Sequence, residues 1–510
     1  MLNPEINLLA YGTDSYKVTH WAFYPKGTTL VYSYGEPRAG GMFPTVTFFG
    51  MQYVLSHLKG QFVTTERIDE AEAIANAHIG PGVFNRADWE YIRDNFGGRL
   101  PLRIKAIPEG TTVPEGNCLF TIQNLGGEQT AWLTNWFETI ISTVWYPTTV
   151  MTASREVRKI IADSLERTGS PEGLPFKLHD FGMRGVSCLE QAAIGGGAHL
   201  ATGALGTDNM IALWWLKEYY GAEEMPGFSI RATEHSIMTA RGVEGEADVV
   251  RQVLDATPSD QMVAMVGDSY DMIGFIEDIL TIPDIYERII NRTAPLIVRP
   301  DSGELPEIDV DVFRALEGVF GSTWNDKSYA VLPDYLRMIQ GDGIKWYRPL
   351  EIETAIDSNY DPKNGQYSGR TSRAVYGEWR HTVADILEAF EDERISADNI
   401  AFGSGGGLLQ QFDRDSQRFA IKCSYAERVV GTDDNGNDVI GGFDIFKRPA
   451  TDPMKNSKRG RLGVIRNDEG VIETVPESEA GELNMLRDVF YHGTQMNIMN
   501  ISEVRANAAL

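Results

Sequence analysis

Short apolar runs recur through the middle of the chain, and each of them ends in glycine or in reactive polar residues. Met262–Val266 is followed by Gly267 and Asp268, and Ile400–Phe402 is followed by a stretch rich in glycine. Apolar runs of this length are typical of buried strands, and the polar residues mark where each strand ends. The same change follows four further runs, Lys177–Phe181, Phe228–Ile230, Pro295–Val298 and Tyr335–Ile339.

Segments with helical apolar spacing separate these runs. They fall at Glu246–Asp255, Met272–Leu280, Val310–Phe320 and Val383–Glu393. Strands that alternate with helices predict a parallel sheet, because parallel neighbours need a crossover connection. We therefore predict a β/α barrel over residues 151–415, with a single site at the C-terminal ends of its strands.

The two ends of the chain lack this alternation. Residues 1–150 predict an α+β region with antiparallel strands, and residues 416–510 predict a β-rich region. We expect one long core helix at Trp132–Val144. A tyrosine-rich segment with turn signals, residues 344–382, predicts a surface insertion whose role the sequence does not indicate. The other expected elements are strands at Leu30–Tyr34, Thr45–Phe49, Leu102–Ile107, Asn117–Gln123, Phe419–Tyr425 and Val439–Phe446, and helices at Arg67–Ile79, Arg86–Asn95 and Ile501–Ala508.

The stretch Asn399–Gln410 reads NIAFGSGGGLLQ, with four glycines in the five positions from Gly403 to Gly407. Glycines between a strand and a helix allow backbone N–H groups to approach an anion closely, with the positive end of the helix behind them. This stretch is therefore a candidate phosphate cradle. The alternative is a tight turn whose backbone needs positive φ angles.

Composition limits the classes of function. A formal charge of −26 disfavours binding to nucleic acid or to an anionic membrane, since both need a broad basic face. A chain of 510 residues, 42% of them hydrophobic, is long enough for two domains or for one barrel with additions. No apolar run approaches the roughly 18–20 residues that a membrane helix needs.

Cysteine usage and the first residues bear on location. The three cysteines, Cys118, Cys188 and Cys423, are widely spaced, which indicates neither a disulfide framework nor a zinc site. The N-terminal stretch lacks a basic region followed by an apolar core, so no signal peptide is expected. Together these features favour a reducing, cytoplasmic location.

One segment is basic although the chain as a whole is acidic. Residues 447–461 contain six basic residues and a single acid, Asp452. Such a segment is either a solvated basic loop or a source of positive charge for a phosphorylated small ligand.

Taken together, the sequence motifs resemble the nicotinamide phosphoribosyltransferases, within the type II phosphoribosyltransferase family. The likeness covers nearly the whole chain, and the order of so many motifs makes it specific. The motifs are Thr13–His20, Tyr32–Tyr34, Leu133–Trp136, His179–Gly182, Arg184–Ser187, Gly206–Asp208, Glu234–Ser236, Asp268–Asp271, Arg299–Gly303, Gln340–Gly343, Ala401–Gln410, Lys422–Tyr425 and Gly460–Leu462.

The resemblance implies an α/β fold, an irregular β/α barrel with an additional α+β domain whose antiparallel sheet is formed by both chain termini. It implies a homodimer with each site at the subunit interface. The implied reaction joins nicotinamide to phosphoribosyl pyrophosphate and yields nicotinamide mononucleotide and pyrophosphate in NAD salvage. Such a site must orient a flat ring, hold two phosphate groups and stabilise an oxocarbenium-like transition state.

For the ring, the resemblance implies Phe181 on one face and Tyr16 of the other subunit on the opposite face, an arrangement that suits a pyridine. Asp208 is expected to accept a hydrogen bond from the carboxamide and to repel nicotinate. Arg184 should lie beside the ring or the 5′-phosphate. Read alone, Phe181 and Tyr16 are ordinary core residues, and Arg184 is a structural ion pair.

For the phosphates and the ribose, the resemblance implies a second group of residues. Asp301 and Asp342 should bind ribose hydroxyls, with Asp301 near a Mg²⁺ that bridges pyrophosphate oxygens, although either aspartate could instead cap a helix. Ala420 stands where we expect a hydroxyl residue, so a phosphate contact there is in doubt. The expected phosphate-binding positions are Arg38, Arg299, Gly341, Asp342, Gly405, Gly406, Arg414, Lys422 and Lys447.

His235 is the candidate for covalent chemistry. In the family this histidine is transiently phosphorylated by ATP, which couples ATP hydrolysis to product formation. We expect Asp268 to hydrogen-bond one ring nitrogen and to leave the other nucleophilic. A lone histidine is more often structural. The alternatives for the whole chain are a nicotinate phosphoribosyltransferase, against which Asp208 argues, and an inert homologue that only binds phosphoribosyl ligands.

Overall fold

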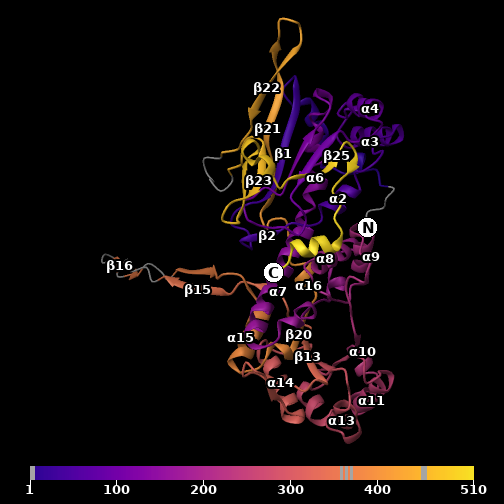
Figure 1. Cartoon of the computed structure of the whole chain (residues 1–510), viewed down its shortest axis with the longest axis vertical. Coiled ribbons are helices and arrows are strands. Elements are labelled where there is room, and N and C mark those ends of the chain that lie inside the picture. The colour runs from indigo at the N-terminus through magenta and orange to yellow at the C-terminus, as the bar shows by residue number, and fades with distance from the viewer. Residues whose placement is uncertain (1–5, 356–359, 362–365, 368–370, 449–455) are drawn as a thin grey trace.

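The computed structural model describes residues 6–355, 360–361, 366–367, 371–448 and 456–510, with the backbone alone for the strands within 351–375. The molecule is elongated, with two large sheets at different levels along its long axis (Figure 1). The upper body holds an antiparallel sheet, and the lower body holds a parallel sheet wrapped by helices. None of the described helices is long and apolar enough to cross a lipid bilayer.

Among the described residues, seven parallel strands form the lower sheet in the order β7-β6-β20-β13-β10-β9-β8. Phe228, three residues before β8, pairs with Gly206 of β7, so the two edges of the sheet meet and close it into an irregular barrel. The strands are β6 (Leu178–Asp180), β7 (Gly206–Thr207), β8 (Arg231–Ala232), β9 (Val263–Val266), β10 (Leu296–Arg299), β13 (Leu336–Gln340) and β20 (Ile400–Ser404).

Helices cover the outside of this barrel because the strands connect through crossovers. Strand β9 is buried at all four positions, and its neighbours place Leu296, Val298 and Met338 in the same core. The surrounding helices are α7 (Trp145–Thr168), α8 (Leu189–Ala201), α9 (Met210–Tyr220), α10 (His235–Met238), α11 (Glu246–Ala256), α12 (Met272–Gly274), a π-helical turn at Phe275–Ile279, α13 (Pro283–Ile290), α14 (Glu307–Phe320), α15 (Thr382–Asp392) and α16 (Gly406–Leu409).

The upper sheet combines both ends of the chain in the order β22-β21-β1-β5-β3-β25-β26. It confirms the predicted fold class, a barrel with an antiparallel-sheet domain built from the two termini. The bounds of the three predicted segments stay a prediction. The strands are β1 (Thr28–Pro37), β3 (Leu102–Ala106), β5 (Phe120–Asn124), β21 (Phe419–Thr432), β22 (Asp438–Asp444), β25 (Arg487–Tyr491) and β26 (Thr494–Gln495).

Shorter elements complete the upper body. A second apolar cluster fills it, with Trp89 and Phe120 fully buried. The elements are helices α1 (Leu8–Tyr11), α2 (Met51–Ser56), α3 (Thr65–His78), α4 (Arg86–Asn95) and α17 (Glu477–Ala480), a 3₁₀ helix η1 (Ser15–Ala22), and the strand pairs β2 (Thr45–Thr47) with β4 (Thr112–Pro114) and β23 (Leu462–Arg466) with β24 (Ile472–Pro476). The C-terminal helix α18 (Ile501–Asn507) packs instead against the core of the barrel.

Two expected elements differ from the structure. The helix predicted at Trp132–Val144 is two short ones, α5 (Leu133–Trp136) and α6 (Glu138–Ser142), with Phe137 between them, and both pack into the same apolar cluster. The strand predicted at Phe228–Ile230 begins later, at Arg231. Phe228 contributes one isolated bridge to β7 instead.

The predicted insertion lies partly outside the described residues. Its described backbone contains the antiparallel pair β15 (Leu350–Ala355) and β18 (Thr371–Tyr376), which projects sideways from the lower body (Figure 1). Its base is tied to the barrel, where β14 (Trp346–Tyr347) pairs with β19 (Arg380–His381).

Candidate active site

The C-terminal ends of the barrel strands carry the predicted site residues to one edge. Each strand runs parallel to its neighbours, so residues that follow the strands directly must share that edge. Phe181 follows β6, Asp208 follows β7, His235 follows β8, Asp268 follows β9, Asp301 follows β10, Asp342 follows β13 and Gly405 follows β20.

His235 and two aspartates form a connected group at this edge. The Nε2 atom of His235 lies 3.0 Å from Oδ1 of Asp268, and its Nδ1 atom lies 3.9 Å from Oδ2 of Asp301. Because a carboxylate can only accept, Nε2 carries the proton and Nδ1 keeps its lone pair. The imidazole side chain is 46% exposed, whereas Asp268 is 5% exposed. The ring is therefore held on one side and accessible on the other.

Asp268 also organises the loop after β10. Its Oδ2 atom accepts hydrogen bonds from the backbone N–H of Asp301, at 3.2 Å, and from the hydroxyl of Ser302, at 2.5 Å. One buried carboxylate thus fixes both the histidine and the neighbouring aspartate. The sequence predicted no role for Ser302, although this residue lies within the motif Arg299–Gly303.

Arg299 sits between Phe181 and Asp301. It forms an ion pair with Asp301, and its guanidinium carbon lies 5.7 Å from the centre of the Phe181 ring. Its Nε–H is buried without a hydrogen-bond partner among the described residues, which leaves a donor for a ligand. Gly341 passes so close that a Cβ there would lie 2.7 Å from this Nε.

Asp301 and Asp342 do not cap helices. Asp301 pairs with Arg299, and helix α14 begins after Pro306 instead. Asp342 is exposed, and no helix in the described part of the chain begins directly after it. Both carboxylates are therefore available at the strand ends, as a ribose or metal–pyrophosphate site requires. Within the described residues no three His, Cys, Asp or Glu side chains form a metal-binding group of their own.

The glycines after β20 are explained by the space beside the backbone, where a Cβ would have to fit, and not by the φ angles that the backbone adopts. Neither Gly403 nor any of Gly405–Gly407 has a positive φ angle, so the alternative of a tight turn that needs one is wrong. A Cβ on Gly403 would lie 2.0 Å from the Phe181 ring, and one on Gly407 would lie 2.4 Å from the carbonyl oxygen of Ile344. A Cβ on Gly406 would meet nothing within 4 Å.

A cavity of about 480 Å³ opens over these glycines. Its walls combine the turn after β13 with the start of α16, so backbone N–H groups and a short helix face one hollow. Lys345, which sequence reasoning missed, also lines it and is exposed. A lysine beside a glycine cradle is suited to a phosphate group. Its position inside the expected insertion hid it.

A second cavity, of about 550 Å³, occupies the barrel interior. Phe181, Asp208, Ser229 and Arg299 line its end at the C-terminal edge, and most of its wall is apolar. Asp208 is exposed to it and accepts a hydrogen bond from the Ser229 hydroxyl at 2.5 Å. An apolar slot with a few polar groups at one end is suited to a small aromatic amide.

Asp180 supports the ring end of this cavity from below. Its carboxylate accepts hydrogen bonds from Asn209 Nδ2 at 2.9 Å and from the backbone N–H of Gly182 at 2.7 Å. Its backbone carbonyl accepts the N–H of Asp208 at 3.0 Å. Burial raises the pKa of Asp180 to about 6, and the Asn209 hydrogen bond opposes that rise.

Four predicted basic residues gather elsewhere. Burial lowers the pKa of Lys422, and the positive charges of Arg38, Lys447 and Arg414 lower it further, while Glu138 opposes them. The four cations are therefore neighbours. No hydrogen bond or ion pair joins them to the strand-end residues within the described part of one chain.

The remaining two predicted ligands are exposed. Tyr16 lies in η1 and is 60% exposed, with an edge contact to His20 at 5.0 Å between ring centres. Arg184 is exposed on the turn after β6, and no ion pair involves it among the described residues, so the structural ion pair considered for it is not observed. Neither of them, nor Phe181 with its half-buried ring, is an ordinary core residue.

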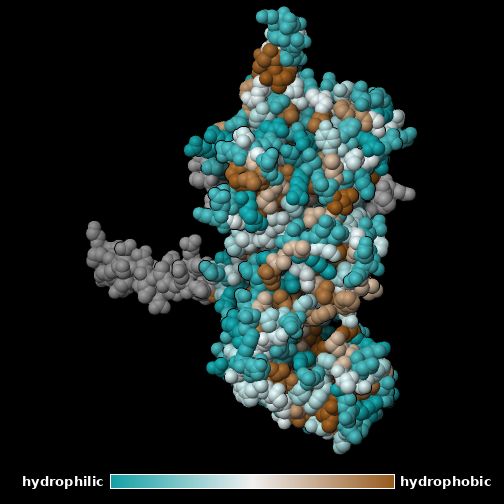
Figure 2. Space-filling view, in the orientation of Figure 1, coloured by the Kyte–Doolittle hydropathy of each residue, from teal (hydrophilic) through white to brown (hydrophobic). Residues whose placement is uncertain are grey.

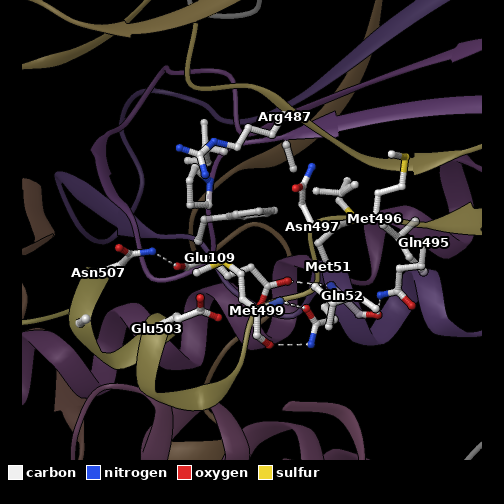
Figure 3. Close-up of a pocket in the computed structure, with 18 residues that line it drawn as sticks. Met51, Gln52, Glu109, Arg487, Gln495, Met496, Asn497, Met499, Glu503 and Asn507 are labelled. Atoms are coloured by element: carbon white, nitrogen blue, oxygen red, sulfur yellow. Dashed lines mark hydrogen bonds between the residues drawn. The ribbon is translucent and has the colours of Figure 1, made fainter. Parts of the chain in front are cut away.

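A third cavity, of about 440 Å³, lies away from this edge, between α2, β25 and α18 (Figure 3). The buried Glu109 carboxylate forms part of its wall and accepts hydrogen bonds from the backbone N–H of Gln52 at 2.7 Å and from the Tyr220 hydroxyl at 2.7 Å. None of the predicted site residues lines it. Its polar groups tie the two bodies together.

Comparisons with known proteins agree with this geometry. The model of the nicotinamide phosphoribosyltransferase N-terminal domain matches residues 7–104, and the model of the nicotinate phosphoribosyltransferase (NAPRTase) family matches residues 176–361 and 369–494. A solved structure described as nicotinate-nucleotide pyrophosphorylase from Pyrococcus furiosus superposes with a TM-score of 0.58 at 14% identity, covering 100% of this chain and 96% of that one. This likeness shows the fold.

Two curated relatives align over almost the whole chain. The nicotinamide phosphoribosyltransferase of Xanthomonas campestris pv. campestris (strain 8004) is 39% identical over 98% of each chain. The nicotinamide phosphoribosyltransferase of Acinetobacter baylyi (strain ATCC 33305 / BD413 / ADP1) is 27% identical, over 97% of this chain and 96% of its own. The chain therefore belongs to the nicotinamide phosphoribosyltransferase family and is an enzyme of the pentosyltransferase class.

Proposed function

We propose that the protein condenses nicotinamide with phosphoribosyl pyrophosphate, yielding nicotinamide mononucleotide and pyrophosphate. The observation that carries this proposal is the convergence of an apolar slot, two carboxylates and a glycine cradle on one edge of the barrel. The slot suits the pyridine ring, the carboxylates lie where positive charge develops at ribose C1, and the cradle suits a phosphate. Displacement at C1 needs all three at once.

Each group has a role that follows from its position. The ring enters the barrel cavity against Phe181 and is oriented by Asp208. Asp301 and Asp342 bind ribose hydroxyls, and Asp301 lies near the Mg²⁺ that neutralises pyrophosphate oxygens when it is bound. Arg299 and the glycines of the cradle bind the 5′-phosphate, with Arg184 beside them.

ATP hydrolysis is coupled to this reaction through His235. Its Nδ1 lone pair attacks the γ-phosphorus of ATP, and the bond to the β-phosphate oxygen breaks, releasing ADP. Hydrolysis of the phosphohistidine later releases phosphate and restores the ring. The Nε2–H bond to Asp268 supports this role, because the carboxylate stabilises the positive charge that the imidazole gains when Nδ1 is phosphorylated.

The working unit is a homodimer that completes each site from two chains. The basic cluster lies on the upper body and consists of Arg38, Arg414, Lys422 and Lys447. Within the described part of one chain, no hydrogen bond or ion pair connects it to the strand ends. A partner would bring them to the pyrophosphate and ATP phosphates, and would bring the exposed Tyr16 to the free face of the ring. The three unpaired cysteines support a cytoplasmic location.

The test is mass-spectrometric detection of nicotinamide mononucleotide from nicotinamide and phosphoribosyl pyrophosphate in the presence of Mg²⁺, with and without ATP. We expect product in both cases and a higher rate with ATP. Nicotinate is the competing substrate in a parallel reaction. A chain that forms only nicotinate mononucleotide would be a nicotinate phosphoribosyltransferase, and a chain that forms neither product would be a binding protein.

A further inference from the structure

The hydroxyl of Ser229 makes the closest side-chain contact to Asp208. Its Oγ atom lies 2.5 Å from Oδ1 of Asp208 and 3.4 Å from the carbonyl oxygen of Ile230. The first distance is that of a charge-assisted hydrogen bond, and the second is at the limit of a hydrogen bond. Ser229 therefore donates its one hydroxyl proton to Asp208.

The backbone fixes this pair before any ligand arrives. The N–H of Thr207 donates to the carbonyl of Phe228 at 2.9 Å, and the N–H of Phe228 donates to the carbonyl of Leu205 at 2.7 Å. These bonds hold the residue after β7 against the segment that leads into β8. A Cβ on Gly227 would lie 2.8 Å from Thr207 Cγ2, so the two backbones approach closely.

The C-terminal helix α18 anchors the same segment from outside the barrel. Arg505 of α18 donates from Nη2 to the carbonyl of Pro226 at 2.6 Å and from Nε to the carbonyl of Leu200 at 3.0 Å. Ser229, three residues further on, is thus carried by a segment held at both ends. Such support keeps a hydroxyl within the tolerance that recognition requires.

The positions of the protons decide which ligand groups Asp208 and Ser229 can bind. Asp208 can only accept, and Ser229 has given its proton to Asp208, so the hydroxyl oxygen also faces the cavity as an acceptor. Oδ2 of Asp208 has no protein donor among the described residues. The pair therefore presents two acceptors and no donor to a ligand.

We propose that Ser229 determines the preference for a carboxamide together with Asp208. This inference rests on the proposed function and adds a second recognition residue to it. The –NH₂ group of nicotinamide has two donors, one for Asp208 Oδ2 and one for Ser229 Oγ. The carboxylate of nicotinate has none and meets only lone pairs and negative charge.

The experiment compares Ser229→Ala and Ser229→Thr with the wild-type chain, using nicotinamide and nicotinate as alternative substrates. Leaving a buried donor of the ligand unpaired costs about 1–3 kcal/mol, so Ser229→Ala should raise the KM for nicotinamide about tenfold. The KM for phosphoribosyl pyrophosphate and kcat should change little. Ser229→Thr, which keeps the hydroxyl, should restore most of the affinity for nicotinamide.

A double-mutant cycle separates this role from a merely structural one. In an Asp208→Ala background, Ser229→Ala should cost much less, because the acceptor that fixes the hydroxyl proton is gone. Ser322→Ala, whose hydroxyl donates to Glu317 at 2.6 Å on the surface, is the matched control and should leave every constant unchanged.

The outcomes are distinct. An unchanged KM for nicotinamide in Ser229→Ala, or an equal loss with nicotinamide and phosphoribosyl pyrophosphate, would overturn the assignment while the proposed function stands. A wild-type chain that makes no nicotinamide mononucleotide would overturn both. The side chain of Ser229 is exposed to the cavity, and equal melting temperatures of the variants will exclude misfolding as the cause.

Discussion

At the scale of single residues, the site is a set of aspartates that each hold a neighbour in one orientation. The Asp268 carboxylate holds His235 and the loop of Asp301, the backbone carbonyl of Asp180 holds the N–H of Asp208, and the Asp301 carboxylate holds Arg299. Among the described residues, Nδ1 of His235, Oδ2 of Asp208 and Nε of Arg299 have no hydrogen-bond partner. Free atoms held by buried partners are pre-organised for ligands.

His235→Ala should abolish ATP hydrolysis and leave slow, ATP-independent synthesis of nicotinamide mononucleotide. The imidazole is the proposed phosphoryl acceptor, whereas the binding groups for ring and ribose stay in place. Phosphate release and nucleotide formation, measured side by side, check this. His78→Ala, at the exposed end of α3, is the control. Full ATPase activity in His235→Ala would refute the role.

Asp208→Asn should shift the substrate preference toward nicotinate. The neutral amide removes the charge repulsion and offers an N–H to the ligand carboxylate. We expect the ratio of kcat/KM for nicotinamide over nicotinate to fall by about two orders of magnitude, the effect of losing a charged hydrogen bond and a repulsion. An unchanged ratio would remove Asp208 from the recognition of the amide.

The residue scale is also where sequence reasoning was least complete. The strand ends could be predicted because apolar runs and their polar ends are written in the sequence. Ser229 and Lys345 could not, since the first lies in an apolar run beside the closure of the barrel and the second lies in the expected insertion. Their positions depend on which strands become neighbours, which the order along the chain does not reveal.

At the scale of elements, the glycine stretch after β20 shows why composition and conformation must be separated. Two of its glycines leave room for the Phe181 ring and for the carbonyl of Ile344, and two leave open space over the cradle. The sequence predicted a phosphate loop here, but it could not distinguish glycines that leave room for neighbouring atoms from glycines that adopt positive φ angles. Both requirements are met by the same residue type.

Gly403→Ala should therefore damage ring binding more than folding. The new Cβ would lie 2.0 Å from the Phe181 ring and force it toward the cavity. We expect the KM for nicotinamide to rise by about tenfold, as a displaced side chain costs about 1–3 kcal/mol. Gly318→Ala, in α14 with nothing within 4 Å, is the control and should keep full activity. Equal kinetics of the two variants would contradict the packing argument.

Helix α14 makes stability depend on pH. Asp309 in its first turn is fully buried, neither of its carboxylate oxygens has a hydrogen-bond partner among the described residues, and burial raises its pKa to about 8. Between the ordinary carboxyl pKa and about 8, the folded state binds a proton that the unfolded state has lost. Folding stability should therefore fall as pH rises through this window.

Asp309→Asn should remove that dependence. The advantage in stability of the variant over the wild type should grow between pH 5 and pH 8 by about 1.4 kcal/mol or more, the value of one pKa unit. Chemical denaturation at the two pH values checks this. A constant difference at both values would mean that Asp309 does not titrate in this range.

At the scale of the whole molecule, two bodies separate the tasks. The barrel carries the residues proposed to bind the ring, the ribose and the 5′-phosphate, and the upper body carries the basic cluster and Tyr16. The two-domain plan could be predicted from the change in alternation along the chain. The way the termini combine in one sheet came from family resemblance, because strands 400 residues apart, such as β1 and β21, have no local signal for pairing.

A mixture of defective chains tests whether sites are shared between subunits. Co-expressed Tyr16→Ala and His235→Ala chains form mixed dimers in which one site has both defects and the other has neither. If half of the dimers are mixed, ATP-dependent activity should reach about one quarter of the wild-type value. Activity equal to the mean of the two pure variants would show that each chain supplies its own Tyr16.

The most direct test of the account is a crystal structure of the protein with nicotinamide mononucleotide and pyrophosphate. We predict the pyridine ring against Phe181 with its carboxamide at Asp208, the ribose at Asp301 and Asp342, and the 5′-phosphate over Gly405 and Gly406. Density for the nucleotide in the cavity between α2, β25 and α18, or with its phosphate away from the cradle, would contradict the account.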